Sequence, residues 1–387
     1  MGAGKRLVIV VAAVAAATAL LAPRISRRSS RPKGTAVSTR SRWPYPLSEK
    51  QDFDLASRLE ILASLQALAR IEQEHLPTFL SVEKVNDSSV ATWKARTRAV
   101  LTANFAAATA DCDAGRDIAC VGKAMGTPEL EAVAASFQNG LPDALRFWYH
   151  DAQAFHRGYH SEQLRRAALF PARTTEMLTF DDSEITGFEL PDRTFLLSFD
   201  DGPTPENGTT DELVSALARA KINGVFFALG DALGARIAST SADEVRALYA
   251  NDCVASHSRT HDPVDEAADW QASVAFTDDL LRRTFPALAG RPMMWRPPYG
   301  RRTADAAKIL AARNTRVVLW NLDSADWDPQ MDAARITDRM ISLMLLWRRG
   351  ILLFHDIHAK GATAVPALVR TFGAAVRWQD CHAFPPA

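Results

Sequence analysis

The sequence predicts an α/β protein in which a barrel-like domain of alternating strands and helices follows a mostly α-helical region. From about residue 46 to 172, leucines and aromatic residues recur every three to four positions, as on amphipathic helices. After about Met177, short runs rich in β-branched and aromatic residues alternate with helical stretches. Polar residues gather at the ends of those runs, where active sites of parallel β/α folds assemble.

The chain has 387 residues, too many for one ordinary domain. We expect four parts. Residues 1–23 form a signal sequence or membrane anchor, 24–45 a basic flexible linker, 46–176 a helical domain of unknown role, and 177–387 the barrel-like domain.

The N-terminal segment concentrates positive charge. Residues 1–43 hold nine Lys or Arg and no acidic residue, so the zero net charge of the chain leaves about −9 on the remainder. The apolar run 7–22 is short for a bilayer span, which needs about 20 residues, and Pro23 disfavours cleavage after Ala22. We expect export to the periplasm or cell envelope, with 7–22 acting either as a signal sequence or as an inner-membrane anchor. The balanced charge excludes a globally basic nucleic-acid binder, and no protein partner is inferred.

Four cysteines accompany this pattern. Cys112 and Cys120 flank a short polar loop and favour a disulfide in an oxidising compartment, with buried free thiols as the alternative. Cys253 and Cys381 lie far apart in sequence, and whether they pair is left open.

Four helices are predicted in the first half. Ser48 and Gln51 resemble a capping box ahead of a leucine repeat, and further helices begin near Asp87, Thr127 and Pro142. The last of these carries three histidines, two of them spaced i, i+4: His150, His156 and His160. A metal pair is one interpretation, but without an intervening Glu a solvated or core-edge histidine face is favoured, and we assign no chemistry.

The second half alternates strands and helices in order. The predicted strands are 194–200, 224–230, 245–250, 253–258, 293–298, 317–323 and 351–356. The predicted helices are 211–220, 274–284, 303–312 and 333–346.

Five polar clusters lie at the ends of strands predicted in this half. They are Asp200 with Asp201, His257 with His261, 296–300, 323–327 and 353–355. One Asp and two His would supply three ligands for zinc or a similar ion and leave positions for water and substrate. A second Phe-Asp-Asp sequence, 180–182, lacks the Gly-Pro that follows Asp201 and is interpreted as a loop.

These five clusters, in this order, resemble the motifs of the polysaccharide deacetylases of carbohydrate esterase family 4. The resemblance covers about residues 193–372 and implies a distorted (β/α) barrel of the NodB-homology type. It implies Asp200 as general base and His355 as general acid. Arg296 would orient the base and Asp326 would tune the histidine.

The resemblance also implies a metal site and a substrate groove. The metal ligands would be Asp201, His257 and His261, holding Zn²⁺ or another divalent ion such as Co²⁺ or Mn²⁺. The substrate residues would be Tyr299, through its backbone N–H, Trp327 as a groove wall and Leu353 beside the acetyl methyl group.

The implied function is hydrolysis of N-acetyl groups on N-acetylglucosamine-containing polysaccharide, with peptidoglycan as the first candidate and acetate as a product. The alternatives are a chitin or exopolysaccharide deacetylase, an O-acetyl xylan esterase, and a non-catalytic glycan-binding protein. All site positions hold the family's residue types, which favours an active enzyme.

Overall fold

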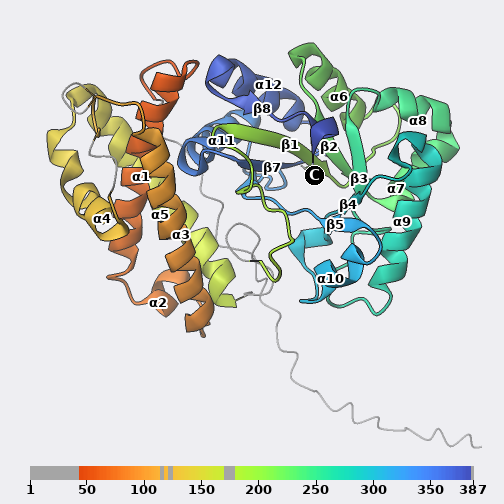
Figure 1. Cartoon of the computed structure of the whole chain (residues 1–387), viewed down its shortest axis with the longest axis horizontal. Helices are drawn as coiled ribbons and strands as arrows, with labels where there is room; N and C mark the ends of the chain where they lie inside the picture. Colours follow the sequence, from red (N-terminus) through yellow and green to blue (C-terminus); the bar gives the residue numbers. More distant parts are fainter. Residues whose placement is uncertain (1–42, 114–116, 121–124, 170–178, 385–387) are drawn as a thin grey trace, which may run out of the picture. The chain divides into compact units, whose positions relative to one another are not determined.

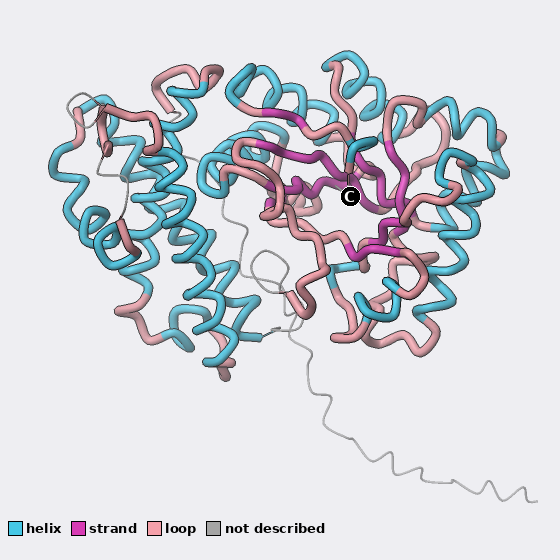
Figure 2. The backbone as a smooth tube through the Cα atoms, in the orientation of Figure 1, coloured by secondary structure: helices cyan, strands magenta, loops and turns pink. Residues whose placement is uncertain are grey.

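The computed structural model describes residues 43–113, 117–120, 125–169 and 179–384, and one parallel sheet organises its second half. Within these residues the sheet has eight strands: β1 (Thr194–Asp200), β2 (Gly224–Ala228), β3 (Cys253–Ser256), β4 (Met293–Trp295), β5 (Thr315–Val317), β6 (Leu322–Asp323), β7 (Gly350–His355) and β8 (Arg377–Trp378). Their order is β5-β4-β3-β2-β1-β7-β6, with β8 beside β1. Figure 1 and Figure 2 show helices around the outside of this curved sheet.

The barrel is not closed by a continuous hydrogen-bonded ladder. Strands β5 and β6 follow each other in sequence, yet they form the two ends of the strand order. Beside this opening, Ile185 forms a parallel bridge with Val318. The predicted distorted (β/α) barrel is therefore confirmed, with its distortion between β5 and β6.

The side chains of strand β1 alternate between the inside of the barrel and the outer helices. Leu196 belongs to the apolar cluster inside the barrel, whereas Phe195, Leu197 and Phe199 pack into the outer cluster with the helices. Successive strand residues point to opposite faces, so Asp200 shares the inner face with Leu196. The sequence of one strand thus places a carboxylate at the end of an otherwise apolar barrel interior.

The helices of this half are α6 (Thr209–Ala220), α7 (Gly230–Ser239), α8 (Ala242–Leu248), α9 (Trp270–Thr284), α10 (Ala306–Ala311), α11 (Ala333–Trp347) and α12 (Gly361–Phe372). Four of them were predicted, but the strand expected at 245–250 is wrong, because α8 occupies most of it. Ser241 caps α8 by accepting a hydrogen bond from Glu244 N, and this favours a helix despite the β-branched and aromatic residues. Helices α7 and α12 and strand β8 were not predicted.

The first half is helical, as expected. It contains α1 (Lys50–Ile71), α2 (Leu76–Leu80), α3 (Asp87–Ala108), α4 (Thr127–Ser136) and α5 (Asp143–Leu169). The helix starts predicted near Asp87 and Thr127 are confirmed. The capping box at Ser48 is wrong, because Glu49 is the N-cap and makes no side-chain capping bond.

Helices α1 and α3 pack against α11 of the barrel through buried polar contacts. Ser57 Oγ donates a hydrogen bond to Leu345 O at 2.7 Å, and Asn104 Nδ2 donates to Leu346 O at 3.0 Å. The last carbonyls of a helix have no partner within the helix, so these side chains satisfy groups that would otherwise be buried unpaired.

Some predictions fall outside the described residues. The segment 1–23 and the linker up to residue 42 lie there, and the proposed boundary after residue 176 lies within 170–178. The division into domains stays a prediction. Among the described helices, none combines the length and hydropathy needed to cross a bilayer.

Candidate active site

The two adjacent carboxylates at the end of β1 differ in their shortest contacts. Asp200 Oδ1 accepts a hydrogen bond from Arg296 Nη1 at 2.8 Å. Asp201 adopts a positive φ of 83°, and its Oδ1 lies 3.4 Å from His257 Nε2 and 3.3 Å from His261 Nε2. Their separate roles as general base and metal ligand stay predictions.

Gly202 permits a close approach directly after this pair. A Cβ at Gly202 would clash with Asp356 Oδ2, which belongs to a buried carboxylate that accepts a hydrogen bond from Thr210 Oγ1. Burial raises the pKa of Asp356 to about 7. Asp356 was not singled out in the sequence, although it directly follows His355.

Arg296 is fully buried, and each of its three guanidinium nitrogens donates a hydrogen bond. Its guanidinium lies over the Phe227 ring at 4.0 Å, and Nη1 also donates to Ser198 Oγ at 2.8 Å. Nε donates to Val318 O and Nη2 to Leu319 O, so the backbone beside the barrel opening fixes the side chain. Because the Arg296 guanidinium is held in one position, its hydrogen bond orients the Asp200 carboxylate.

Asp201, His257 and His261 form a three-ligand cluster. His257 Nδ1 donates to Arg296 O at 2.8 Å, which leaves the Nε2 lone pair facing Asp201. Among the described residues Asp201 Oδ1 is buried without a hydrogen-bond partner. The ligand atoms of the three residues lie within 4.8 Å of one another. An unpartnered carboxylate oxygen between two imidazole nitrogens fits a divalent cation such as Zn²⁺.

The electrostatics of this cluster favour ligands in their metal-binding forms. Burial alone would raise the pKa of Asp201, but the interaction with the nearby His257, together with the charges of His355 and His261, holds that pKa below its ordinary value. Burial, with the nearby His257, lowers the pKa of His261. An ionised carboxylate and a neutral imidazole are the forms that bind a metal.

His355 lies at the end of β7, opposite Asp200 in the β1–β7 register. Its Nδ1 lies 2.7 Å from Asp326 Oδ1. Burial would lower the pKa of His355, but the charge and hydrogen bond of Asp326 outweigh it and raise the pKa to about 10. A protonated imidazole beside the carboxylates of β1 is suited to donate a proton to a leaving group.

The predicted substrate residues differ in exposure. The Tyr299 and Trp327 side chains are 59% and 40% exposed, and the Tyr299 ring meets the His261 ring edge-on at 4.2 Å between centroids. Leu353 is buried in the apolar cluster inside the barrel, two residues before His355. Exposed aromatic rings beside a polar site are suited to contact a sugar chain, and the roles of all three residues stay predictions.

Sequence reasoning missed several residues that support the site. Ser198 Oγ accepts from Arg296 and donates to Leu352 O, which links β1 to β7. Lys360 Nζ donates to the carbonyl oxygens of Asp326 and Asp328, both at 2.8 Å. The position of Ser198, two residues before Asp200 on the same strand face, was the one available signal.

Two of the three histidines of α5, His156 and His160, belong to the core instead of a metal site. His156 Nε2 lies 3.0 Å from Glu60 Oε1, and His160 Nε2 lies 2.9 Å from Ser64 Oγ. Both rings are fully buried, so a solvated histidine face is wrong for them, whereas His150 is exposed. Burial lowers the pKa of His160 to about 3 and keeps it neutral.

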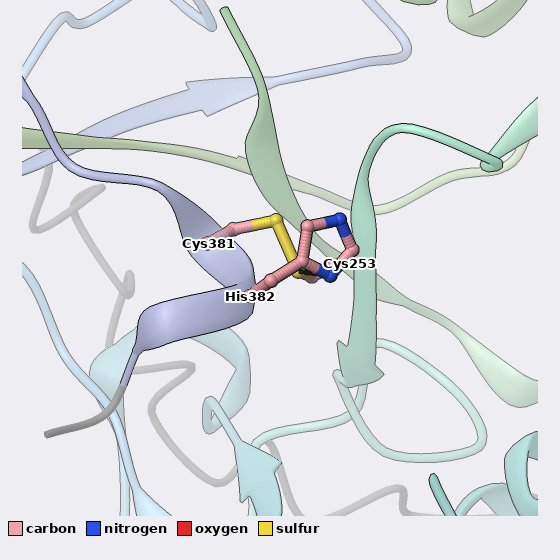
Figure 3. Close-up of side chains that lie close together, drawn as sticks. All are labelled: Cys253, Cys381 and His382. Carbon is pink, nitrogen blue, oxygen red and sulfur yellow. Dashed lines mark hydrogen bonds between the residues drawn. A yellow bond between two sulfur atoms is a disulfide. The ribbon is translucent and has the colours of Figure 1, made fainter. Parts of the chain in front are cut away.

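A second cluster of residues whose side chains can bind metals lies away from the active site, at the start of β3. It consists of Cys253, Cys381 and His382. Figure 3 shows Cys381 bonded to Cys253, with the His382 ring beside the sulfur atoms. Cys112 and Cys120 are also joined. Because both thiols are oxidised, the Cys253 cluster has no thiolates to offer a metal, and both cysteine pairings considered from the sequence are present.

Comparison with known proteins gives one family. The model of the family described as polysaccharide deacetylase matches residues 187–318. This range includes Asp200 and Asp201 at the end of β1, the two histidines of the ligand cluster (His257 and His261) and Arg296. The segments 323–327 and 353–355, which carry Asp326 and His355, lie beyond it.

Two curated relatives are similar over part of the chain. A chitooligosaccharide deacetylase of Rhizobium leguminosarum bv. trifolii is 30% identical over 171 residues, which cover 43% of this chain and 72% of that protein. A bifunctional xylanase/xylan deacetylase of Cellvibrio japonicus is 32% identical over 143 residues, 36% of this chain and 20% of that protein. The chain thus spans only a fifth of the second relative. Among solved structures, a peptidoglycan deacetylase from Bacillus subtilis has 25% identity and a TM-score of 0.39, over 49% of this chain and 86% of that one.

Proposed function

The chain belongs to the polysaccharide deacetylase family, and from that premise we propose that it is a metal-dependent hydrolase of N-acetyl groups on N-acetylglucosamine-containing polysaccharide. Water and the acetylated sugar would give acetate and a free amine. We propose peptidoglycan as the polymer to test first, because the apolar run 7–22 between basic flanks favours export to the cell envelope, with an inner-membrane anchor.

One observation carries the metal dependence. Asp201 Oδ1 is buried between the Nε2 atoms of His257 and His261, at 3.4 and 3.3 Å, and has no hydrogen-bond partner among the described residues. A buried carboxylate oxygen left in this way is costly unless a cation satisfies it. A divalent ion bound here would polarise an acetyl carbonyl and lower the pKa of the attacking water.

Asp200 has the geometry of a general base. Arg296 binds its Oδ1, and Oδ2 lies 3.8 Å from His257 Nε2, on the side of the ligand cluster. A carboxylate with one oxygen fixed and the other facing the reacting water can take the proton without reorienting.

His355 has the properties of a general acid. An amine leaves an amide only when it is protonated, and Asp326 keeps the His355 ring charged and fixed in orientation. The Tyr299 N–H would stabilise negative charge on the carbonyl oxygen, Trp327 would line the sugar groove, and Leu353 would border the acetyl methyl group.

An O-acetyl esterase acting on xylan is the second candidate. The similarity to the bifunctional xylanase/xylan deacetylase favours it. Hydrolysis of an ester needs the same general base and the same polarisation of the carbonyl group as hydrolysis of an amide. It depends less on a proton donor, because an alkoxide leaves more readily than an amide nitrogen.

The test is acetate release by the full chain from three substrates: peptidoglycan, chitooligosaccharides and acetylated xylan. We expect release from the N-acetyl polymers, loss on chelation, and recovery on adding Zn²⁺, Co²⁺ or Mn²⁺. Asp200→Asn should lower the rate by about 100-fold or more. Asp181→Asn is the matched control, because Asp181 belongs to the other Phe-Asp-Asp sequence and lies exposed in a turn.

Two results would contradict the proposal. Full activity in the presence of chelator would remove the metal from the mechanism. Release from acetylated xylan alone would replace the N-acetyl function with the esterase function.

A further inference from the structure

Asp323 opens the segment 323–327 and receives contacts from two helices. Its side chain is buried, and Oδ2 accepts a hydrogen bond from Arg166 Nη2 of α5 at 3.3 Å. Its carbonyl oxygen accepts from Arg339 Nε of α11 at 2.9 Å. One residue of the barrel rim is thus held by both its side chain and its backbone.

Helix α5 also binds Arg339, which is fully buried, through the side chain of Glu162. Glu162 Oε2 accepts from Arg339 Nη2 at 2.9 Å, and Oε1 accepts from Nη1 at 3.3 Å. Glu162 and Arg166 are four residues apart and therefore share one face of α5. We refer to these four residues as the Asp323 network: Glu162, Arg166, Asp323 and Arg339.

The backbone after Asp323 leads directly to the carboxylate that holds His355. Asp323 Oδ1 accepts from Ala325 N at 2.8 Å, and Ala325 has a positive φ of 56°. Such a conformation is uncommon for a residue with a Cβ and needs support from its surroundings. Asp326 follows and accepts both the ring Nδ1 and the backbone N–H of His355.

The charges in the Asp323 network are matched. Burial alone would raise the pKa of Asp323, but the charges of Arg166 and Arg339 hold that pKa below its ordinary value. Removing one partner of a buried charged group leaves the other uncompensated, so the segment should relax when α5 loses a charge.

We propose that the Asp323 network positions Asp326 against His355, so that the N-terminal helical region supports proton donation without touching substrate. Glu162 and Arg166 are positioning residues in this scheme. The inference rests on the proposed deacetylase function, because it assigns His355 the proton donation that an amide requires. It also gives the helical region a role that its sequence alone did not suggest.

The test compares Arg166→Met, Arg166→Lys and Glu162→Gln with Asp54→Asn. Asp54 is the matched control, because its Oδ1 accepts from Arg348 Nη2 at 2.7 Å and so joins α1 to the end of α11, away from 323–327. Each enzyme is assayed on a chitooligosaccharide and on 4-nitrophenyl acetate, whose phenolate leaves without a proton.

Arg166→Met and Glu162→Gln should lower kcat on the chitooligosaccharide by about 10-fold, with KM unchanged and less than about twofold loss on the aryl ester. Arg166→Lys should recover part of that loss, and Asp54→Asn should show no selective loss. Equal loss on both substrates, or no loss in Arg166→Met, would overturn the proposal.

A second measurement needs no substrate. Hydrogen–deuterium exchange at residues 323–328 and at the His355 amide should be about 10-fold faster in Arg166→Met than in the wild type or Asp54→Asn. Equal exchange in the three proteins would overturn the positioning role even if the enzyme is active. Absence of acetate release by the wild type, with selective loosening in Arg166→Met, would instead refute the proposed function and leave the bracing of the segment supported.

Discussion

Both nitrogen donors on one side of His355 bind the same carboxylate, that of Asp326. The ring Nδ1 lies 2.7 Å from Oδ1, and the backbone N–H donates to Oδ2 at 2.8 Å. Asp326 is fully buried, so its charge acts on the imidazole through a poorly screened medium. The carboxylate therefore fixes both the direction of the ring and its protonation.

Asp326→Asn should move the alkaline limit of activity to lower pH. His355 donates a proton only below its pKa, which Asp326 raises to about 10, so wild-type kcat should fall as the pH rises through that range. Without the Asp326 charge, burial is opposed only by the charges of Asp200 and Asp201, and the limit should fall by about one to three pH units. The measurement is the pH dependence of kcat on a chitooligosaccharide.

Asp328→Asn serves as the control for that profile, because Asp328 lies two residues further along and its side chain accepts from Gln330 N. It should leave the alkaline limit in place. An unchanged limit in Asp326→Asn would mean that another group donates the proton.

Asp201→Asn should weaken metal binding directly. The substitution removes the negative charge that faces His257 and His261, at 3.4 and 3.3 Å, and offers a neutral amide in its place. We expect Zn²⁺ affinity to fall by about 100-fold or more, since even groups outside the ligand set contribute about 10- to 100-fold. Calorimetric titration of the metal-free protein measures this without any substrate.

Asp262→Asn is the comparison for metal binding. Asp262 directly follows His261, but its carboxylate accepts from Thr260 Oγ1 and lies outside the ligand cluster. Equal Zn²⁺ affinity in the two variants would show that Asp201 is not a ligand.

Asp252→Asn should stabilise the protein at alkaline pH. Asp252 is buried where β3 begins and accepts a hydrogen bond from Gly224 N at 3.0 Å, which an Asn oxygen can keep. Burial raises the pKa of Asp252 to about 7, against the smaller lowering by that N–H. A folded-state pKa above the unfolded value means that the contribution of Asp252 to wild-type stability is fully present below about pH 4 and is lost as the pH rises through about 7.

The variant should therefore gain about 4 °C or more in Tm over the wild type at pH 8 and little at pH 4. Asp279→Asn, on the exposed face of α9, should give no pH-dependent gain. A gain that is equal at both pH values would refute burial of charge as the cause.

The sequence predicted the rim of the barrel well because each polar cluster lies at the end of a strand or directly after it. Asp200 and His355 are far apart in the chain, yet both end buried runs that the register of β1 and β7 brings side by side. The helix at α8 was missed because Val245 and Tyr249 suggest a strand, although Ser241 and Glu244 have the spacing of a capping box.

The residues that hold the rim in position, such as Glu162 and Arg339, could not be predicted in the same way. Glu162 and Arg339 are 177 residues apart and carry ordinary charged side chains on helices. Local periodicity indicates which helix face is buried, but not which distant helix covers it. The contact between α5 and α11 depends on tertiary packing, which leaves no local pattern.

The disulfide between Cys253 and Cys381 should stabilise the fold more than the one between Cys112 and Cys120. It joins residues 128 positions apart, whereas the other pair is separated by 8. In the chain-entropy account, loops of these lengths contribute roughly 5 and roughly 2.5 kcal/mol to the free energy of unfolding. Double Ser variants of each pair, compared by urea denaturation, test the difference without leaving free thiols.

Equal losses in the free energy of unfolding would contradict the entropic account. The Cys253 pair joins the start of β3, four residues before His257, to the buried Cys381, so its loss should also lower Zn²⁺ affinity.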